Sequence, residues 1–115
     1  MINLEDLERL VTEVQTKNQI LQNIMMQKQT LAVQSKELEM ALEEIEKSGN
    51  EIYKSVGPIL IKTTKIDIKK DLEEKKEDID IKIKTMDRQE KKLAEQIKEN
   101  QKALQEMINT RKTTE

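Results

Sequence analysis

The stretch EIYKSVGPILIKTT, residues 51–64, divides the sequence into two parts of similar length and decides how both are interpreted. Two short runs rich in β-branched residues, 51–56 and 59–64, meet at Gly57-Pro58, the one Gly-Pro pair in the chain. Runs of this kind, joined by two turn residues, are typical of a β-hairpin. We therefore predict a β-hairpin over residues 51–64.

The predicted hairpin carries more apolar side chains than a free-standing hairpin needs. The second run is continuously apolar over residues 59–61, which indicates burial on both faces. An isolated hairpin is marginally stable in water and leaves its strand edges unpaired. We therefore expect it to pair with other chains. The residues predicted to carry this assembly are Ile52, Tyr53, Val56, Gly57, Pro58, Ile59, Leu60 and Ile61.

The segment before the hairpin, residues 3–48, carries a sustained heptad pattern. Nine of its twelve a and d positions are apolar, and no Gly or Pro interrupts them, which is typical of a coiled-coil helix. Asn3 is placed to act as the N-cap. Gly49 is suited to end the helix in the left-handed conformation. The a positions are Leu7, Val14, Leu21, Lys28, Ser35 and Leu42, and the d positions are Leu10, Lys17, Ile24, Leu31, Leu38 and Ile45.

The segment after the hairpin, residues 65–111, mirrors the first. Thr64 followed by Asp67 suggests a capping box, and eight of eleven a and d positions are apolar. Lys76 at a seam position is expected to extend its ammonium group to solvent, and Asn100 to specify register. The d positions are Leu72, Ile79, Met86, Leu93, Asn100 and Met107, and the a positions are Lys76, Ile83, Glu90, Ile97 and Leu104.

The apolar seams of the two segments are of similar length, so they can pack against each other in an antiparallel coiled coil, with both termini at one end. Two registers one heptad apart both match apolar to apolar, so the register stays open. Residues 78–84 alternate with the period of a strand, but no turn residue bounds them, and the helix is favoured.

The composition of the 115 residues argues against an enzyme. The chain has no His, no Cys and one aromatic residue, so it lacks the usual parts of zinc sites, thiol chemistry and nucleophile pairs. We expect no metal and no cofactor. A formal net charge of −2 gives no attraction to nucleic acid or anionic lipid, and no apolar run could span a membrane. The sequence favours a soluble, intracellular protein.

Five stretches together resemble one family. The hairpin residues 52–57 (IYKSVG) and 59–65 (ILIKTTK), with 87–90 (DRQE), closely resemble beta-type subunits of archaeal prefoldin, and 27–30 (QKQT) and 41–45 (ALEEI) are similar as well. A single hairpin points to the beta type, because alpha-type subunits carry two. The resemblance implies an all-α dominated fold in one domain, 1–115, with coiled-coil helices 3–48 and 65–111 and a hairpin, 51–64, that joins an inter-subunit β-barrel.

The resemblance also implies a function. Members of this family are cytoplasmic co-chaperones, built as hexamers of alpha-type and beta-type subunits. The tips of their coiled coils hold non-native proteins and pass them to a group II chaperonin without ATP. The chain has no Gly-x-x-x-x-Gly-Lys phosphate-binding sequence, in agreement with this.

The end of the coiled coil is the candidate client-binding site, because the last turns fray and leave seam residues partly exposed. Met25 and Met26, in mid-helix, are a candidate client groove, but the favoured explanation is that Met25 lies beside the seam and Met26 is ordinary surface. The alternative function is a structural coiled-coil adaptor or spacer that binds one specific partner helix. The candidate client-binding residues are Ile2, Leu4, Leu7, Leu10, Val11, Met107 and Ile108.

Overall fold

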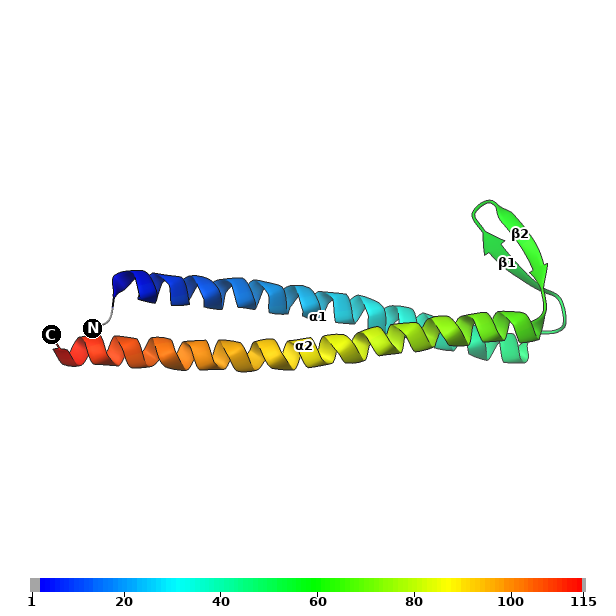
Figure 1. Ribbon diagram of the computed structural model, residues 1–115. Helices are drawn as coiled ribbons and strands as arrows, with labels where there is room; N and C mark the ends of the chain where they lie inside the picture. The colour runs from blue at the N-terminus through cyan, green and yellow to red at the C-terminus, as the bar shows by residue number, and fades with distance from the viewer. Residues whose placement is uncertain (1–2, 115) are drawn as a thin grey trace. The chain divides into compact units, whose positions relative to one another are not determined.

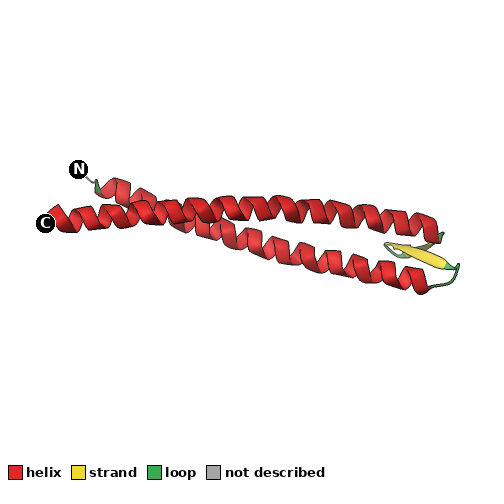
Figure 2. Cartoon of the chain, turned by 90° about the horizontal axis from the view of Figure 1, so that it is seen from below, coloured by secondary structure: helices red, strands yellow, loops and turns green. Residues whose placement is uncertain are grey.

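Two long helices with one β-hairpin between them make up the chain (Figures 1 and 2). The computed structural model describes the backbone of residues 3–114 and the side chains of residues 3–110. Helix α1 spans Leu4–Lys47, strand β1 Ile52–Val56, strand β2 Ile59–Thr63 and helix α2 Lys65–Thr114. This confirms the predicted all-α dominated fold with a single hairpin at the helix-helix connection. Residues 78–84 belong to α2, so the helical interpretation of that segment is confirmed.

Contacts divide the chain into two units, each of which is described by itself. The terminal unit comprises residues 3–27 and 85–114, and the hairpin unit comprises residues 28–84. In the terminal unit the two helical segments run side by side and antiparallel, with both chain ends at the same end of the pair (Figures 1 and 2). In the hairpin unit the strands extend from the connection between α1 and α2 (Figure 1).

The predicted heptad positions form the less exposed side of each helix. All twelve a and d positions of α1 and all eleven of α2 are half-buried or buried. Ile24 and Ile97 in the terminal unit are 9% and 7% exposed, and Ile68 in the hairpin unit is 9% exposed. Few side chains are fully enclosed, because a pair of helices covers each seam from one side only. Burial of apolar side chains along these seams is what stabilises the helices.

Both helices begin at the predicted caps. Asn3 Oδ1 accepts a hydrogen bond from the Glu5 N–H at 3.0 Å, and Thr64 Oγ1 accepts one from the Asp67 N–H at 3.1 Å. Each cap residue also accepts the first helical hydrogen bond on its carbonyl, from Leu7 and Ile68 respectively. These bonds satisfy amide donors that have no partner within the helix.

The end of α1 differs from the prediction for Gly49. The helix ends at Lys47, and Gly57 is the glycine with positive φ among the described residues, so Gly49 is not in the left-handed conformation. Ser48 ends the helix instead, because its N–H and its Oγ both donate to the Ile45 carbonyl, at 3.2 and 2.8 Å. The prediction for Gly49 was wrong because the Ser48 hydroxyl donates to a carbonyl in the last turn of the helix. A left-handed residue would have been needed to bring backbone N–H groups to such carbonyls instead.

The hairpin turn follows from its two residues. Val56 pairs with Ile59, so Gly57 and Pro58 are the two central residues of the turn. Gly57 has φ of +57°, which glycine adopts without the steric cost that a side chain would add. The proline ring holds φ near −65°, which excludes a type I′ turn and fits type II′. Type II′ matches the twist of the strands, which fixes the register over five residue pairs.

Candidate interaction surfaces

The first candidate surface lies at the free end of the terminal unit. Leu4 is 55% exposed and Val11 is 37% exposed, while Leu7 and Leu10 on the seam side are half-buried. On α2, Met107 and Ile108 are half-buried and belong to the last two turns of the helix, Lys65–Thr114. These turns lie at the same end of the unit as the start of α1 (Figure 1). Six of the seven predicted tip residues therefore retain accessible apolar surface. The seventh, Ile2, lies outside the described residues.

The tip residues belong to the last two turns before each chain end, where no further helical layer covers them. A client segment placed there would bury apolar area at about 25 cal/mol per Å². Charged side chains share the first turns of α1 with the patch: Glu5 and Asp6 follow the cap, and the Asp6 carboxylate pairs with Arg9. The end of the unit thus offers a small apolar patch with charged neighbours on α1.

The second candidate surface is the hairpin, which is apolar and exposed on both faces. Ile52, Lys54 and Val56 share one face with their partners Thr63, Ile61 and Ile59, as predicted for β1, and Tyr53 and Leu60 lie on the other. Leu60 is 70% exposed, Ile59 60%, Tyr53 54%, Ile61 49% and Val56 48%. The continuous apolar run 59–61 predicts burial on both faces, but no part of the chain within residues 3–110 buries these three side chains.

Two lysine side chains, Lys54 and Lys65, link the hairpin region to the two helices. Lys54 Nζ on β1 lies 2.9 Å from Asp71 Oδ2 on α2, which turns the Lys54 face of the hairpin toward that helix. Lys54 lowers the pKa of Asp71 through this hydrogen bond. Lys65 Nζ donates to the carbonyls of Glu46 and Ser48, at 3.0 and 3.5 Å, so a cation caps the C-terminal end of α1.

A polar layer crosses the seam of the hairpin unit. Ser35 Oγ donates to Asp80 Oδ1 at 3.0 Å, and Lys76 Nζ lies 2.9 Å from Asp80 Oδ2. The Lys76 side chain is 26% exposed, and its ammonium group pairs with Asp80, whose side chain is 43% exposed. The neighbouring carboxylate at i+4 offers a stronger partner than water alone.

Two contacts between the helices fix the register within the hairpin unit. Ser35 bonds to Asp80, and Lys69 Nζ lies 2.5 Å from Glu46 Oε1, so both contacts join residues whose numbers add to 115. This selects one of the two pairings that the heptad pattern left open. In the terminal unit, Asn100 Nδ2 is buried and has no hydrogen-bond partner, so no bond from that atom supports the register role predicted for Asn100.

Asp80 makes the polar layer sensitive to acid. The hydrogen bonds from Lys76 and then Ser35 hold the pKa of the Asp80 carboxyl below its ordinary value of 3.8. Because the pKa of Asp80 is lower in the folded chain than in the unfolded chain, the charged carboxylate stabilises the fold at any pH above about 3.8. This stabilisation is lost as the pH falls through the lower pKa of the folded chain. We expect Asp80→Asn to lower the melting temperature at pH 7 by a few degrees at most, because solvent-accessible ion pairs are weak.

The same melts, followed by circular dichroism, check the sign of this effect. The difference between Asp80→Asn and the unaltered chain is expected to shrink as the pH is lowered past 3.8, since both then lack the charge. Asp78→Asn, an exposed position two residues away, is the matched control and should melt like the unaltered chain at every pH. A difference that stays constant with pH would rule out the ion pair as its source.

Ile66 is a strongly exposed apolar residue that the sequence pattern did not single out. It follows the hairpin in the first turn of α2 and is 80% exposed. The signal in the sequence is an apolar residue outside the heptad positions, close after the hairpin.

Comparison with known proteins places the chain in a family. The family model described as "Prefoldin subunit" matches residues 8–111. The chain belongs to the prefoldin family. The crystal structure of the prefoldin beta subunit from Thermococcus strain KS-1 is similar, with a TM-score of 0.82 and 33% identity over 92% of this chain and 96% of that chain. No curated protein sequence matches the chain.

Prefoldin membership confirms the resemblance and agrees with the single hairpin between two helices. Prefoldin chains are chaperone subunits that assemble with other prefoldin subunits. No helix within residues 3–114 is long and apolar enough to cross a membrane.

Proposed function

We propose that this chain is a beta-type prefoldin subunit that captures non-native proteins at the tip of its coiled coil and delivers them to a group II chaperonin without ATP. The observation that carries the proposal is the apolar tip, where Leu4 is 55% and Val11 37% exposed beside the half-buried Met107 and Ile108. Such a patch binds apolar segments, and unfolded chains expose many while native proteins expose few.

Assembly through the hairpin is the second part of the proposal. Apolar side chains are exposed on both hairpin faces, and within residues 3–114 each strand has one edge without a strand partner. Adding strands from other subunits would pair those edges and bury Ile59, Leu60 and Ile61 together. The partners are an alpha-type subunit and further beta-type copies in a hexamer, joined by a β-barrel platform and working in the cytoplasm.

The third part is how weak tips hold a client. One tip presents a few apolar side chains, so its affinity for any segment is low. Several tips in one assembly act at high effective concentration on a single client, which strengthens retention without any new contact. Each tip still releases quickly, so a client can be transferred without nucleotide hydrolysis. Methionine suits this task, because its flexible thioether side chain adapts to varied partners.

The experiment is an aggregation assay with the assembled complex. Substoichiometric complex, without nucleotide, is expected to suppress aggregation of several unrelated denatured proteins. A coiled-coil adaptor or spacer would instead protect none of them and would select one partner helix. Protection of none, with the complex intact, would therefore replace the chaperone function by the adaptor function.

A further inference from the structure

One face of α1 in the terminal unit carries no charge. The sequence has no acidic residue between Glu13 and Glu37, although the chain has 23 acidic residues. Within residues 14–27, ten residues are exposed and none of them is charged; the one charge, Lys17, lies at a seam position. These ten exposed residues are called the neutral face. They are mostly Gln and Asn, with three large apolar side chains: Gln15, Thr16, Asn18, Gln19, Ile20, Gln22, Asn23, Met25, Met26 and Gln27.

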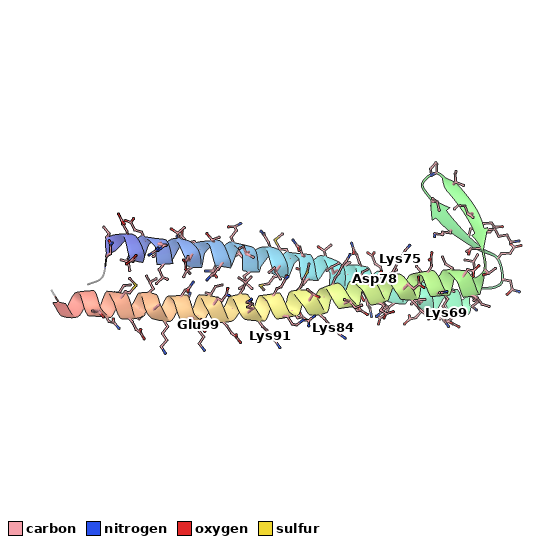
Figure 3. The ribbon with its side chains drawn as sticks, viewed as in Figure 1. Lys69, Lys75, Asp78, Lys84, Lys91 and Glu99 are labelled. Carbon is pink, nitrogen blue, oxygen red and sulfur yellow. The ribbon has the colours of Figure 1, made fainter. Side chains whose placement is uncertain are left out.

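The other side of the same unit is strongly charged. Of the fifteen exposed residues in 85–110 of α2, eight are charged. Lys91 and Glu99 are two of them and extend from α2 on the side away from α1 (Figure 3). Within the terminal unit, charge is therefore absent from the exposed surface of residues 14–27 only, while α2 and the first turns of α1, with Glu8 and Glu13, carry it. The exposed face of a helix is usually rich in charged residues, which keep it in solution. A stretch that exposes apolar side chains and no charge is therefore a candidate contact surface for another molecule.

The chemistry of the neutral face fits an uncharged polypeptide. Met26 is 67% exposed, Met25 51% and Ile20 43%, so apolar surface is available along the helix. The surrounding glutamine amides both donate and accept hydrogen bonds, as peptide groups do. A non-native chain offers apolar side chains together with peptide groups that lack partners. No buried charge would have to be desolvated when such a chain binds here.

The shape of the neutral face suits an extended segment. A 14-residue helical segment is about 21 Å long, and the ten exposed residues are distributed along all of it. An extended chain rises about 3.3 Å per residue, so about six residues of a client would cover this length. So short a contact is useful when the same molecule is also held elsewhere.

We infer that the neutral face is a second contact for the client, along the side of the coiled coil and behind the tip. The inference rests on the proposed function, because it takes the tip as the first contact. A client segment bound at the tip continues along α1 and lies on Met25, Met26 and the neighbouring glutamines. The ligand is a segment of non-native polypeptide with low charge.

Photo-crosslinking on the assembled complex locates the contact. A photoreactive amino acid replaces Gln22 on the neutral face, and Gln101, exposed on α2, is the matched control position. With a denatured client of low charge, we expect crosslinks to the client from position 22 at least about fivefold above those from position 101. Equal yields, or crosslinks from position 22 to a second copy of this chain, would overturn the inference.

Charge insertion gives an independent test. Gln19→Glu, Gln22→Glu and Met26→Glu together place three carboxylates on the neutral face, and binding a client would then desolvate them. We expect client capture to weaken at least about fivefold. Gln89→Glu, Ala94→Glu and Gln101→Glu add the same charge to exposed positions of α2 and should change capture less than about twofold.

Failure of the inference is distinguishable from failure of the proposed function. If the unaltered complex protects clients and both triple variants protect equally, the neutral face is not a contact and the tip remains the site. If the unaltered complex protects no client, the proposed function itself fails. Complex mass and helix content, measured for every variant, show that the charges act on capture and not on assembly.

Discussion

Ile59→Asp and Ile61→Asp together are expected to break the assembled complex into monomers and small oligomers. Both side chains lie on the Lys54 face of the hairpin and are about half exposed or more in the single chain, at 60% and 49%. Burial of two unpaired carboxylates in an inter-subunit sheet would cost several kcal/mol, and the loss would favour the separated subunits. The helices should survive, because their seams do not depend on the hairpin.

Sedimentation velocity measures the loss of assembly, and circular dichroism measures the retained helix. Val33→Asp with Met40→Asp is the matched control, because these side chains lie on α1, are 53% and 56% exposed, and receive the same charges. The control is expected to sediment as the intact complex. An unchanged sedimentation coefficient for the hairpin variant would show that assembly does not use this face.

Removal of the tips is expected to abolish client protection while leaving assembly intact. The trimmed chain lacks residues 1–10 and 107–115, which contain six of the seven candidate client-binding residues; Val11 remains. Full burial of one Leu is worth about 1.5–3 kcal/mol, so the loss of several such contacts at each tip should raise the amount of complex needed for protection at least about tenfold. The remaining heptads and the hairpin keep the fold and the platform.

A milder variant keeps the helix length. Leu4→Ser with Val11→Ser removes the two most exposed tip side chains, and we expect protection to fall about threefold, since half-exposed side chains contribute part of the full burial energy. Val33→Ser with Met40→Ser removes apolar side chains that are 53% and 56% exposed, against 55% and 37% for Leu4 and Val11, lies outside the tip and should protect normally. If the trimmed complex protects as well as the full-length one, the tip is not the client site.

The helices could be predicted from the sequence because a heptad seam is a local and redundant signal. Every a and d position proposed for α1 and α2 is half-buried or buried, including polar ones such as Ser35 and Lys76. The hairpin could be predicted because Gly57-Pro58 allows few turns, and the observed pairing of Val56 with Ile59 follows from it.

Other features could not be predicted because they depend on side-chain competition or on distant contacts. The Ser48 hydroxyl, and not Gly49, ends α1, because it donates to the Ile45 carbonyl. Which of the two residues ends the helix depends on the local path of the backbone. The register of the hairpin unit is specified by Ser35 and Asp80, which a pattern of apolar residues does not contain. Ile66 was overlooked because it lies outside the heptad frame.

The measurement that tests the account most directly combines this chain with an alpha-type prefoldin subunit and records complex mass and client protection on the same sample. We expect a hexamer that suppresses aggregation of several unrelated denatured proteins without nucleotide, while this chain carrying Ile59→Asp and Ile61→Asp should give neither the hexamer nor the protection. A hexamer that protects no client, or protection by the unassembled hairpin variant equal to that of the hexamer, would contradict it.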